Sequence, residues 1–303
     1  MDLSNKDVIH IKKNGVEYLQ FKKLLEYSDI INHAYTLGIE KDYRTSTVDK
    51  KLLSQDKYEI AVDNYKKICE ELHTNYINIA QPLQQHTKNV LTISEKMHTN
   101  KPDFGYGEYK NTDGLVTNKK NIILSTTNAD CILLLLFDPV KKVIANVHSG
   151  WNGTLQRISV VGVNKMINEF NCNPEDIICC ICPSIRKCHF EVDEDVKNMF
   201  ESEFQDFENY DFPNNIENDM IKEIIDHQKE KKHLDNIIEY NKEKNKWHID
   251  TVLINRVLLT KIGLKDENII DCGICSVCNS NLIHSFRVEK DGYGLETALI
   301  ELK

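Results

Sequence analysis

Two residues with metal-ligand chemistry stand at the open end of a predicted hairpin. Cys131 begins the apolar run Cys131–Phe137, and His148 ends the run Lys142–His148. Asp138-Pro139, between the runs, is a turn signal, so the runs are predicted to be antiparallel strands. A cysteine thiolate and a histidine imidazole are good ligands for zinc. The pair is therefore a candidate metal site if the two side chains meet.

The length of the loop decides whether they meet. With a loop of residues 138–141, Phe137 pairs with Lys142 and Cys131 lies directly opposite His148; a two-residue loop at Pro139-Val140 gives the same register. Directly opposed residues in an antiparallel pair have Cβ atoms about 4.5–5.5 Å apart and share one face of the sheet. A slip of one residue would send them to opposite faces, so the prediction needs an even loop.

A third ligand is only weakly indicated by the residues themselves. Catalytic zinc sites have three protein ligands and keep the fourth tetrahedral position for water. His86, within Gln84–Thr87, is one of the chain's 11 histidines and is the candidate third ligand. The alternative is that Cys131 is a buried thiol beside a hydrogen-bonded His148.

Apolar patterns predict the elements around this hairpin. Strands are expected at 121–126, 131–137, 143–147 and 177–182, and helices at 57–73 and through the stripe Val160, Val163, Ile167 and Phe170. The strand 131–137 is apolar on both faces, so we expect it to be buried on both sides of a sheet.

Near the start of the chain, Asn14-Gly15 separates two alternating apolar runs. Both positions of a tight hairpin turn need positive φ, which Asn and Gly tolerate. The segments Val8–Ile11 and Val16–Phe21 are therefore predicted to form a β-hairpin.

The later part of the chain changes character. Residues 201–246 are rich in Glu, Asp, Asn and Lys, which predicts a charged surface excursion with a helix at about 220–240. Residues 247–262 are predicted to be helical, and 268–287 to return to short strands. No internal repeat or flexible linker divides the sequence, so we expect one α+β domain over residues 1–303.

Bulk composition limits the class of protein. Of 303 residues, 41% are hydrophobic and 28% charged, which is ordinary for a globular protein. A net charge of −9 argues against general affinity for nucleic acid or anionic membranes. No signal-peptide pattern opens the sequence, and no apolar run approaches the roughly 20 residues that span a bilayer. We expect a cytoplasmic protein whose ten cysteines are mostly reduced.

Several segments around the candidate ligands resemble successive blocks of one family. They are Asn128–Cys131, His148–Thr154 and Cys182–Val192, with Gln85-His86, Gly273–Cys278 and Ser285–Arg287 in the same order. The family is that of bacterial and animal purine nucleoside phosphorylases first classed as multicopper polyphenol oxidases or laccase-domain proteins. Some of its members are called peptidoglycan editing factors.

The resemblance implies that His86, Cys131 and His148 together bind zinc, with copper as the less favoured metal. It implies a fold of layered mixed sheets flanked by helices, similar to the catalytic domain of cytotoxic necrotizing factor. It also implies phosphorolysis of adenosine, inosine and S-methyl-5'-thioadenosine, and hydrolytic deamination of adenosine. The expected partners are small-molecule nucleosides and phosphate, with no nucleic acid and no membrane; no oligomeric state is predicted.

The implied reactions make different demands on the site. An open zinc position lowers the pKa of bound water to about 7, which suits hydroxide attack on the purine C6. Phosphorolysis needs phosphate held beneath the ribose by cations or N–H donors. The turn through Gly150 and Gly153 into a helix near Leu155 could present such N–H groups. The alternative for these glycines is a plain tight turn.

Three further side chains are candidates. Asp130 precedes Cys131 and either takes part in acid/base chemistry or orients the loop by hydrogen bonding; we favour the second. Arg287 and Arg186 are candidates for holding phosphate, because arginine suits bidentate contact with oxyanions. Each is otherwise an ordinary structural or surface arginine. The candidate catalytic set is Cys131, Asp130 and Arg287.

The chain departs from the family pattern at positions that carry arginine in many members. Asn152 stands where the family often has Arg, Tyr35–Gly38 lacks the Thr-Arg pair, and Gly294-Leu295 replaces Gly-Arg. The whole chain has five arginines. The three zinc-ligand positions are intact, so these departures bear on the substrate and the rate rather than on the metal.

Cys272, Cys275 and Cys278 form a Cys-x-x-Cys-x-x-Cys run. Such a run could begin an iron–sulfur or structural zinc site. No Cys-Pro follows and no second spaced pair is evident, and the resemblance places Cys275 and Cys278 in a block that is not a ligand set. We therefore expect ordinary buried thiols here, and core thiols in the strand 177–182.

Three other functions are alternatives. An editing hydrolase acting on nucleotide-linked peptidoglycan precursors could use the same zinc-bound water. A copper-dependent polyphenol oxidase is physically less suited, because three ligands without a second Cys–His cluster or a Met partner do not hold several coppers. A non-catalytic metal-binding protein would need a fourth protein ligand to close the site.

Overall fold

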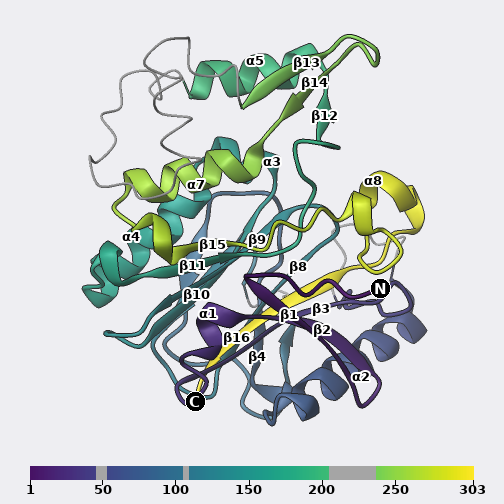
Figure 1. Ribbon diagram of the computed structural model, residues 1–303. Helices are drawn as coiled ribbons and strands as arrows, with labels where there is room; N and C mark the ends of the chain where they lie inside the picture. Colours follow the sequence, from purple (N-terminus) through teal and green to yellow (C-terminus); the bar gives the residue numbers. More distant parts are fainter. Residues whose placement is uncertain (46–52, 105–108, 205–236) are drawn as a thin grey trace.

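Two large β-sheets face each other, with helices on both outer sides (Figure 1). The computed structural model describes residues 1–45, 53–104, 109–204 and 237–303. Helix α2 (Gln55–Glu71) packs on one outer side, and helices α4 (Ile158–Phe170) and α7 (Thr251–Lys261) pack on the other. The layers are thus helix, sheet, sheet and helix, and each sheet buries both of its faces.

The first sheet has the strand order β1-β2-β3-β16-β8-β4-β6. Its strands are β1 (Val8–Lys13), β2 (Val16–Phe21), β3 (Ile31–Thr36), β4 (Ile79–Gln81), β6 (Asp103–Phe104), β8 (Ile123–Asn128) and β16 (Glu296–Leu302). Neighbouring strands are antiparallel, except that β4 runs parallel to both β6 and β8. The short helix α1 (Lys22–Leu25) follows β2.

The second sheet has the strand order β15-β11-β9-β10-β7-β5. Its strands are β5 (Val90–Thr92), β7 (Gly114–Thr117), β9 (Ile132–Asp138), β10 (Val143–Ser149), β11 (Ile178–Ile181) and β15 (Ile269–Asp271). The outer pairs β5–β7 and β11–β15 are parallel, and the central pairs are antiparallel. One residue, Gly150, separates the end of β10 from helix α3 (Trp151–Leu155).

A small third sheet has the order β12-β14-β13. Its strands are β12 (Glu191–Val192), β13 (Ile238–Asn241) and β14 (Lys246–Ile249). Helix α5 (Glu194–Glu203) shares a hydrophobic cluster with it, through the fully buried Phe200 and Ile249. Helix α8 (Phe286–Glu289) precedes the final strand β16.

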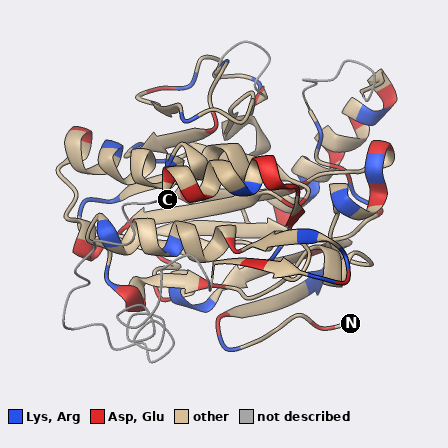
Figure 2. Ribbon diagram, turned by 90° about the horizontal axis from the view of Figure 1, so that it is seen from above, with Lys and Arg blue, Asp and Glu red and all other residues tan. Residues whose placement is uncertain are grey.

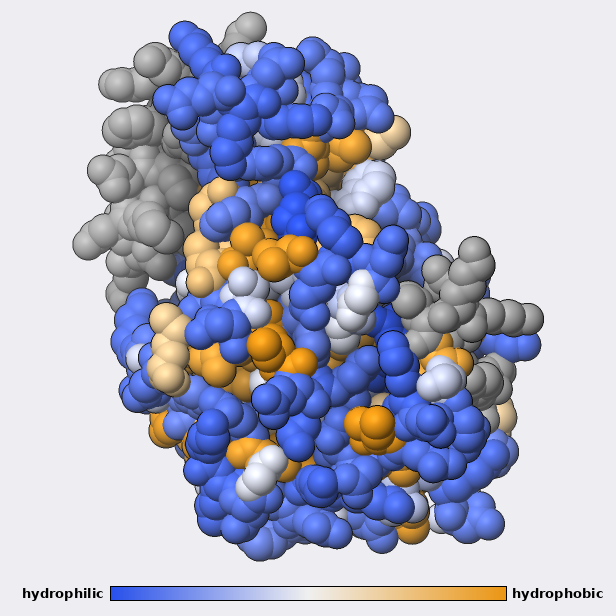
Figure 3. Space-filling model, turned by 90° about the vertical axis from the view of Figure 1, so that its right-hand side faces the viewer, coloured by the Kyte–Doolittle hydropathy of each residue, from blue (hydrophilic) through white to orange (hydrophobic). Residues whose placement is uncertain are grey.

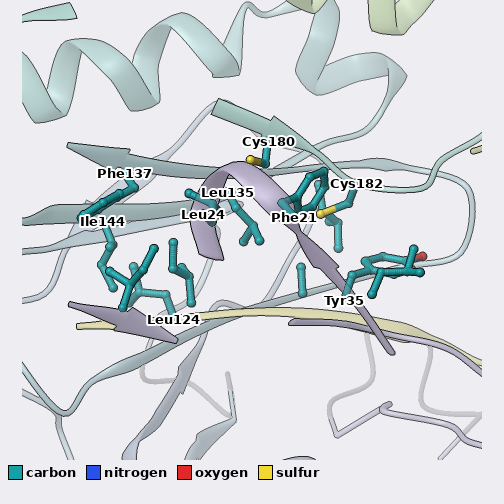
Figure 4. Close-up of a cluster of buried hydrophobic side chains, with 14 of the residues drawn as sticks. Phe21, Leu24, Tyr35, Leu124, Leu135, Phe137, Ile144, Cys180 and Cys182 are labelled. Carbon is teal, nitrogen blue, oxygen red and sulfur yellow. The ribbon is translucent and has the colours of Figure 1, made fainter. Parts of the chain in front are cut away.

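A hydrophobic cluster between the two large sheets holds them together, with Phe21 and Tyr35 on one side and Leu135 and Phe137 on the other (Figure 4). Odd-numbered residues of β9 enter this cluster, and even-numbered residues pack under α4 and α7. The prediction that this strand is buried on both sides of its sheet is confirmed.

The β1–β2 hairpin is as predicted. Lys13 pairs with Val16, so the loop has two residues, and Asn14 and Gly15 have φ values of 51° and 77°. The predicted helices at 57–73 and around Val160–Phe170 are also confirmed, as α2 and α4. Helix α4 ends at Phe170, and its C-cap residue Asn171 takes the left-handed conformation that commonly caps a helix.

The β9–β10 hairpin is shifted by two residues from the predicted register. Asp138 pairs with Val143, and His148 pairs with Leu133 instead of Cys131. The predicted direct opposition of Cys131 and His148 is therefore wrong. Cys131 lies just before the first residue of β9, one step beyond the described pairing.

The cause is the role of Asp138 in the turn. Asp138 is the last strand residue, and its Oδ1 accepts hydrogen bonds from the backbone N–H groups of Val140 and Lys141. The loop is therefore residues 139–142, with Lys142 at a φ of 54°. Because this loop still has an even number of residues, both candidate ligands stay on the same face of the sheet.

The predictions for the later part of the chain are partly wrong and partly fall outside the described residues. Residues 205–236, which include most of the expected charged excursion and its helix, lie outside the described residues. Residues 238–249 form the β13–β14 hairpin, with Tyr240 and Trp247 in ring contact across it, instead of the end and start of helices. Helix α7 starts at Thr251 because the side chain of Asp250 accepts from the N–H of Leu253. In 268–287, β15 is followed by turns and the start of α8 instead of more strands.

The surface carries both signs of charge. Figure 2 shows Lys, Arg, Asp and Glu interspersed on helices and loops around central strands that are mostly uncharged. The face in Figure 3 is mainly hydrophilic, with small separate hydrophobic areas. In the described part of the chain, no helix combines the length and apolar character needed to cross a bilayer.

The mixed α+β architecture of layered sheets flanked by helices is confirmed. The likeness to the catalytic domain of cytotoxic necrotizing factor and the extent of one domain over residues 1–303 stay predictions.

Candidate metal centre

The side chains of His86, Cys131 and His148 converge on one point. Their ligand atoms all lie within 4.8 Å of one another, and Cys131 Sγ lies 3.8 Å from His86 Nε2. The two imidazole rings meet edge to face, with centroids 5.0 Å apart. His148 is buried, Cys131 is half-buried and His86 is exposed, so the cluster lies at the boundary of the interior and the solvent.

The three side chains come from three segments at one end of the second sheet. Cys131 immediately precedes β9, and His148 is the next-to-last residue of β10, where the chain turns into α3 (Figure 1). His86 lies in the loop between β4 and β5, and its φ of 58° is unusual for a residue with a side chain. Contacts from other residues must therefore hold this loop in that conformation.

The buried carboxylate of Asp113 does this. It accepts hydrogen bonds from the backbone N–H groups of Gln85, His86 and Thr87, and from the Thr87 hydroxyl, at 2.7–3.2 Å. Its Oδ1 also lies 2.9 Å from Nδ1 of His148. Asp113 thus fixes the loop of one candidate ligand and the ring of another, and leaves Nε2 of His148 as the ring atom free to bind.

The electrostatics favour a thiolate at Cys131. Burial alone would raise the pKa of this thiol, but His148 and His86 lower it to about 6. Burial would lower the pKa of His148, but the Cys131 thiolate and Asp113 raise it to about 9. For Asp113, burial raises the pKa, while His148 and Thr87 lower it below its usual value. The thiolate is the form of cysteine that binds metal ions.

Gly150 provides the space that the cluster occupies. A Cβ atom at this position would lie 2.7 Å from Cδ2 of His86 and 3.2 Å from Sγ of Cys131. The backbone of Gly150, with a φ of −65°, is one that any residue can adopt. Glycine is therefore required here by the close approach of two candidate ligands and not by its conformation.

Asn152 occupies the position where the family often has arginine. Its Nδ2 donates to the backbone carbonyl of His86 at 2.9 Å, and Gln156 Nε2 reaches the same oxygen at 3.4 Å. Asn152, in α3, and Gln156, its C-cap residue, thus support the His86 loop. Helix α3 has five residues, so the expected helix N-terminus beyond Gly150 is only a short turn of helix before α4 begins.

Both carboxylate oxygens of Asp130 accept hydrogen bonds. Its Oδ1 accepts from the Ser276 hydroxyl at 2.6 Å, and its Oδ2 accepts from the backbone N–H of Arg287 at 2.7 Å. Its backbone carbonyl accepts from the N–H of Ile185 at 2.8 Å. Asp130 has a φ of 84°, so it turns the chain immediately before Cys131. These contacts support the orienting role over the acid/base role.

The two candidate phosphate-binding arginines differ. Arg186 is paired with Asp271 at 2.8 Å and donates to the carbonyl of Ile274, so its guanidinium joins two loops. That arrangement is structural. Arg287 donates from Nη2 to the carbonyl of Glu191 at 3.1 Å and remains partly exposed. Arg287 therefore stays a candidate for anion binding.

Sequence reasoning missed Asp113, Gly150 as a spacer, and Asn152 as a support of the His86 loop. Asp113 stands before Gly114, and an Asp-Gly pair reads as a turn signal. No local pattern indicates that its carboxylate collects donors from residues 85–87 and 148. Such a role depends on long-range packing, which spacing along the chain does not reveal.

We predict that Asp113→Asn weakens metal binding at this candidate centre by about 10–100-fold, the usual effect of losing a partner of a metal ligand. An amide has one accepting oxygen in place of two, so the donors of the His86 loop and His148 compete for it. Chelator competition measures the affinity. Asp138→Asn is the matched control, because this buried carboxylate caps the turn at the other end of β9. Equal losses in both variants would contradict the role of Asp113.

We predict that Gly150→Ala weakens metal binding at this candidate centre by ~10-fold or more while the thermal midpoint changes little. The added Cβ displaces the exposed His86, and the backbone conformation needs no change. Gly292→Ala is the control, since no atom lies within 4 Å of a Cβ there. Metal affinity of Gly150→Ala equal to that of the control would show that the three side chains do not act together.

Comparison with known proteins identifies the family. The family model described as "Multi-copper polyphenol oxidoreductase laccase" matches residues 38–220 and 210–303. The chain is 27% identical over 254 residues to purine nucleoside phosphorylase YlmD of Bacillus subtilis, covering 82% of this chain and 79% of the relative. It is 26% identical over 220 residues, 73% of each protein, to adenosine deaminase RL5 from an unknown prokaryotic organism.

The fold has a counterpart among solved structures. The crystal structure of YlmD from Geobacillus stearothermophilus superposes with a TM-score of 0.76 at 18% identity, over 98% of this chain and 99% of that chain. The resemblance drawn from the blocks around Cys131 and His148 is thereby confirmed. Because the family model spans most of the chain, this protein belongs to the multi-copper polyphenol oxidoreductase laccase family, whose curated relatives include purine nucleoside phosphorylases.

Proposed function

We propose that this protein is a zinc-dependent purine nucleoside enzyme. It cleaves adenosine, inosine and S-methyl-5'-thioadenosine with phosphate, and it deaminates adenosine. The observation that carries the proposal is the convergence of His86, Cys131 and His148 at the edge of the solvent. Relatives named purine nucleoside phosphorylase and one named adenosine deaminase, aligned over most of the chain, support it.

The donor set fits zinc with one open position. One thiolate and two imidazoles match the three protein ligands of catalytic zinc sites, whereas structural sites have four. Gly150 leaves the space between the donors clear of a side chain, and Asp113 fixes the ring of His148. A bound zinc ion supplies Lewis-acid chemistry to whatever occupies the open position. The cofactor is therefore proposed to be zinc, with copper as the less favoured metal.

The surrounding residues orient the centre. Asp113 and Asn152 hold the backbone of the His86 loop from two sides, which fixes the exposed ligand. Asp130 joins Cys131 to the loops that carry Ser276 and Arg287. We assign Asp130 a positioning role, since both of its oxygens accept hydrogen bonds from the protein.

Arg287 is proposed to hold phosphate. Its backbone is fixed to Asp130, the neighbour of Cys131, and its side chain is partly exposed. A guanidinium anchored through one nitrogen can still present other N–H groups to an oxyanion. The family arginine absent at Asn152 is not replaced by another cation at that position, so phosphate binding by this protein depends more heavily on Arg287.

The other functions have weaker support. This centre has one cysteine and two histidines, a set for a single ion, whereas multicopper oxidation of phenols needs several coppers that exchange electrons. A non-catalytic role needs a fourth protein ligand, and none is among the described residues that converge on this centre. An editing hydrolase on nucleotide-linked peptidoglycan precursors would use the same centre and is the second candidate. The cytoplasmic location stays a prediction.

The function is tested by product analysis of purified protein with each nucleoside, with and without phosphate. We expect release of the free base to require phosphate, and inosine to form from adenosine without it. Cys131→Ala should lower both activities by more than about 100-fold, since even partners of metal ligands are worth 10–100-fold. Cys172→Ala, which removes a buried thiol outside the centre, should retain them.

Zinc-loaded protein that turns over none of the three nucleosides would refute the proposal. Release of an amino acid from a misloaded peptidoglycan precursor, lost in Cys131→Ala, would instead identify the editing hydrolase.

A further inference from the structure

A second cluster of thiol and imidazole groups shares no residue with the candidate metal centre. It consists of Cys188, His189, Cys275 and Cys278, whose ligand atoms lie within 4.8 Å of one another. The expectation of ordinary buried thiols in the Cys272–Cys278 run is wrong for Cys278, which is exposed. The expectation that no second Cys–His cluster exists is also wrong. The missing partners, Cys188 and His189, come from a distant segment that spacing alone does not connect to this run.

The separations match one tetrahedral coordination sphere. Cys188 Sγ lies 3.7 Å from Cys275 Sγ and 4.0 Å from Cys278 Sγ. His189 Nδ1 lies 3.2, 3.6 and 3.5 Å from the sulfurs of Cys188, Cys275 and Cys278. Zinc bonds of about 2.3 Å to sulfur and about 2.0 Å to nitrogen, at tetrahedral angles, place neighbouring ligands roughly 3.5–3.8 Å apart. The four donors already surround a site for one ion.

Neither a disulfide nor apolar burial explains this grouping. The Cys188 sulfur lies 3.7 Å from that of Cys275 and 4.0 Å from that of Cys278, far longer than the roughly 2.05 Å of a disulfide bond, and all three cysteines are free. Cys188 and Cys278 are exposed, so hydrophobic burial does not bring their thiols together. Three thiols and a ring nitrogen directed at one point are the arrangement that a thiophilic cation stabilises.

Backbone contacts bring the two segments together. Ser184 forms a parallel bridge with Cys275, and the N–H of Ser276 donates to the carbonyl of Ser184 at 3.0 Å. The backbone N–H groups of Cys278 and Arg186 also lie within hydrogen-bonding reach of the Cys275 thiol. Such N–H groups stabilise a metal-bound thiolate.

We propose that Cys188, His189, Cys275 and Cys278 bind a structural zinc ion. Three thiolates and one imidazole fill all four tetrahedral positions, which is the pattern of a structural site. The candidate centre at His86, by contrast, has three ligands and an open side. The chain thus holds two zinc ions with different roles. The second does not depend on the proposed function.

The second zinc clamps the loops beside Cys131. The segments 183–190 and 272–279, which supply its ligands, both contact Asp130. Ile185 donates to the carbonyl of Asp130, and Ser276 donates to its carboxylate. Because Asp130 directly precedes Cys131, loss of this clamp loosens the support of the first centre. The clamp is therefore a stabilising device with an indirect effect on activity.

Zinc content of the full-length protein, purified without added metal and measured by mass spectrometry, tests the proposal. We expect two zinc ions per chain in the natural protein, one in Cys131→Ala, one in Cys188→Ser and none in the double variant. Cys272→Ala, which removes the cysteine of the same run that lies outside the cluster, should retain two. Cys188 is exposed, so its replacement by serine leaves the core unchanged.

A spectroscopic measurement covers the case in which Cys188→Ser fails to fold. Cobalt-loaded Cys131→Ala should show intense thiolate-to-cobalt absorption with the visible bands of tetrahedral cobalt, because its remaining site has three sulfur ligands. Absence of that absorption would overturn the proposal. So would one zinc per chain that Cys131→Ala removes and Cys188→Ser leaves in place, or iron in place of the second zinc.

Discussion

The carboxylate of Asp113 is the interaction on which the candidate metal centre depends. It is fully buried, and a buried carboxylate is costly unless its oxygens accept enough hydrogen bonds. Here the partners are the N–H groups of the His86 loop, the Thr87 hydroxyl and the ring of His148. Each of these bonds is strengthened by the negative charge. Because the buried carboxylate of Asp113 needs these hydrogen-bond donors, it brings two candidate metal ligands together.

The sheet places Asp113 where it can do this. Asp113 immediately precedes β7, and β7 pairs with β10 so that Gly114 faces Val147. The next residue of β10 is His148, whose N–H donates to the backbone carbonyl of Asp113 at 2.7 Å. Strand β9 lies on the other side of β10 and brings Cys131 to the same end. The pairings of β10 with β7 and with β9 thus position His148 and Cys131. The carboxylate of Asp113 positions the third candidate ligand, His86.

Much of this could be predicted from sequence, and the reasons for the failures are physical. The Asn14-Gly15 hairpin, the doubly buried β9 and helix α2 follow from local patterns of turn residues and apolar spacing. The predicted β9–β10 register is wrong by two residues, because Asp138 ends the strand and caps the turn with its side chain. Both ligands nevertheless remained on one face, since side-chain direction alternates with a period of two.

Contacts between distant segments could not be predicted from local patterns. Asp113 and Asn152 act on residues 85–87 through packing that no spacing rule encodes. Cys188 and His189 meet Cys275 and Cys278 only because the loops after β11 and β15 are neighbours. The hairpin β13–β14 interrupts a stretch whose composition favoured helix, and its pairing outweighs that local preference.

The most direct test of the account is a crystal structure of the zinc-loaded protein with diffraction data on both sides of the zinc absorption edge. We expect an anomalous peak bonded to Cys131 Sγ and to imidazole nitrogens of His86 and His148, with a water or a substrate atom in the fourth position. A peak there with a fourth protein ligand would contradict a catalytic centre. The absence of a peak among these three residues would contradict the metal centre itself.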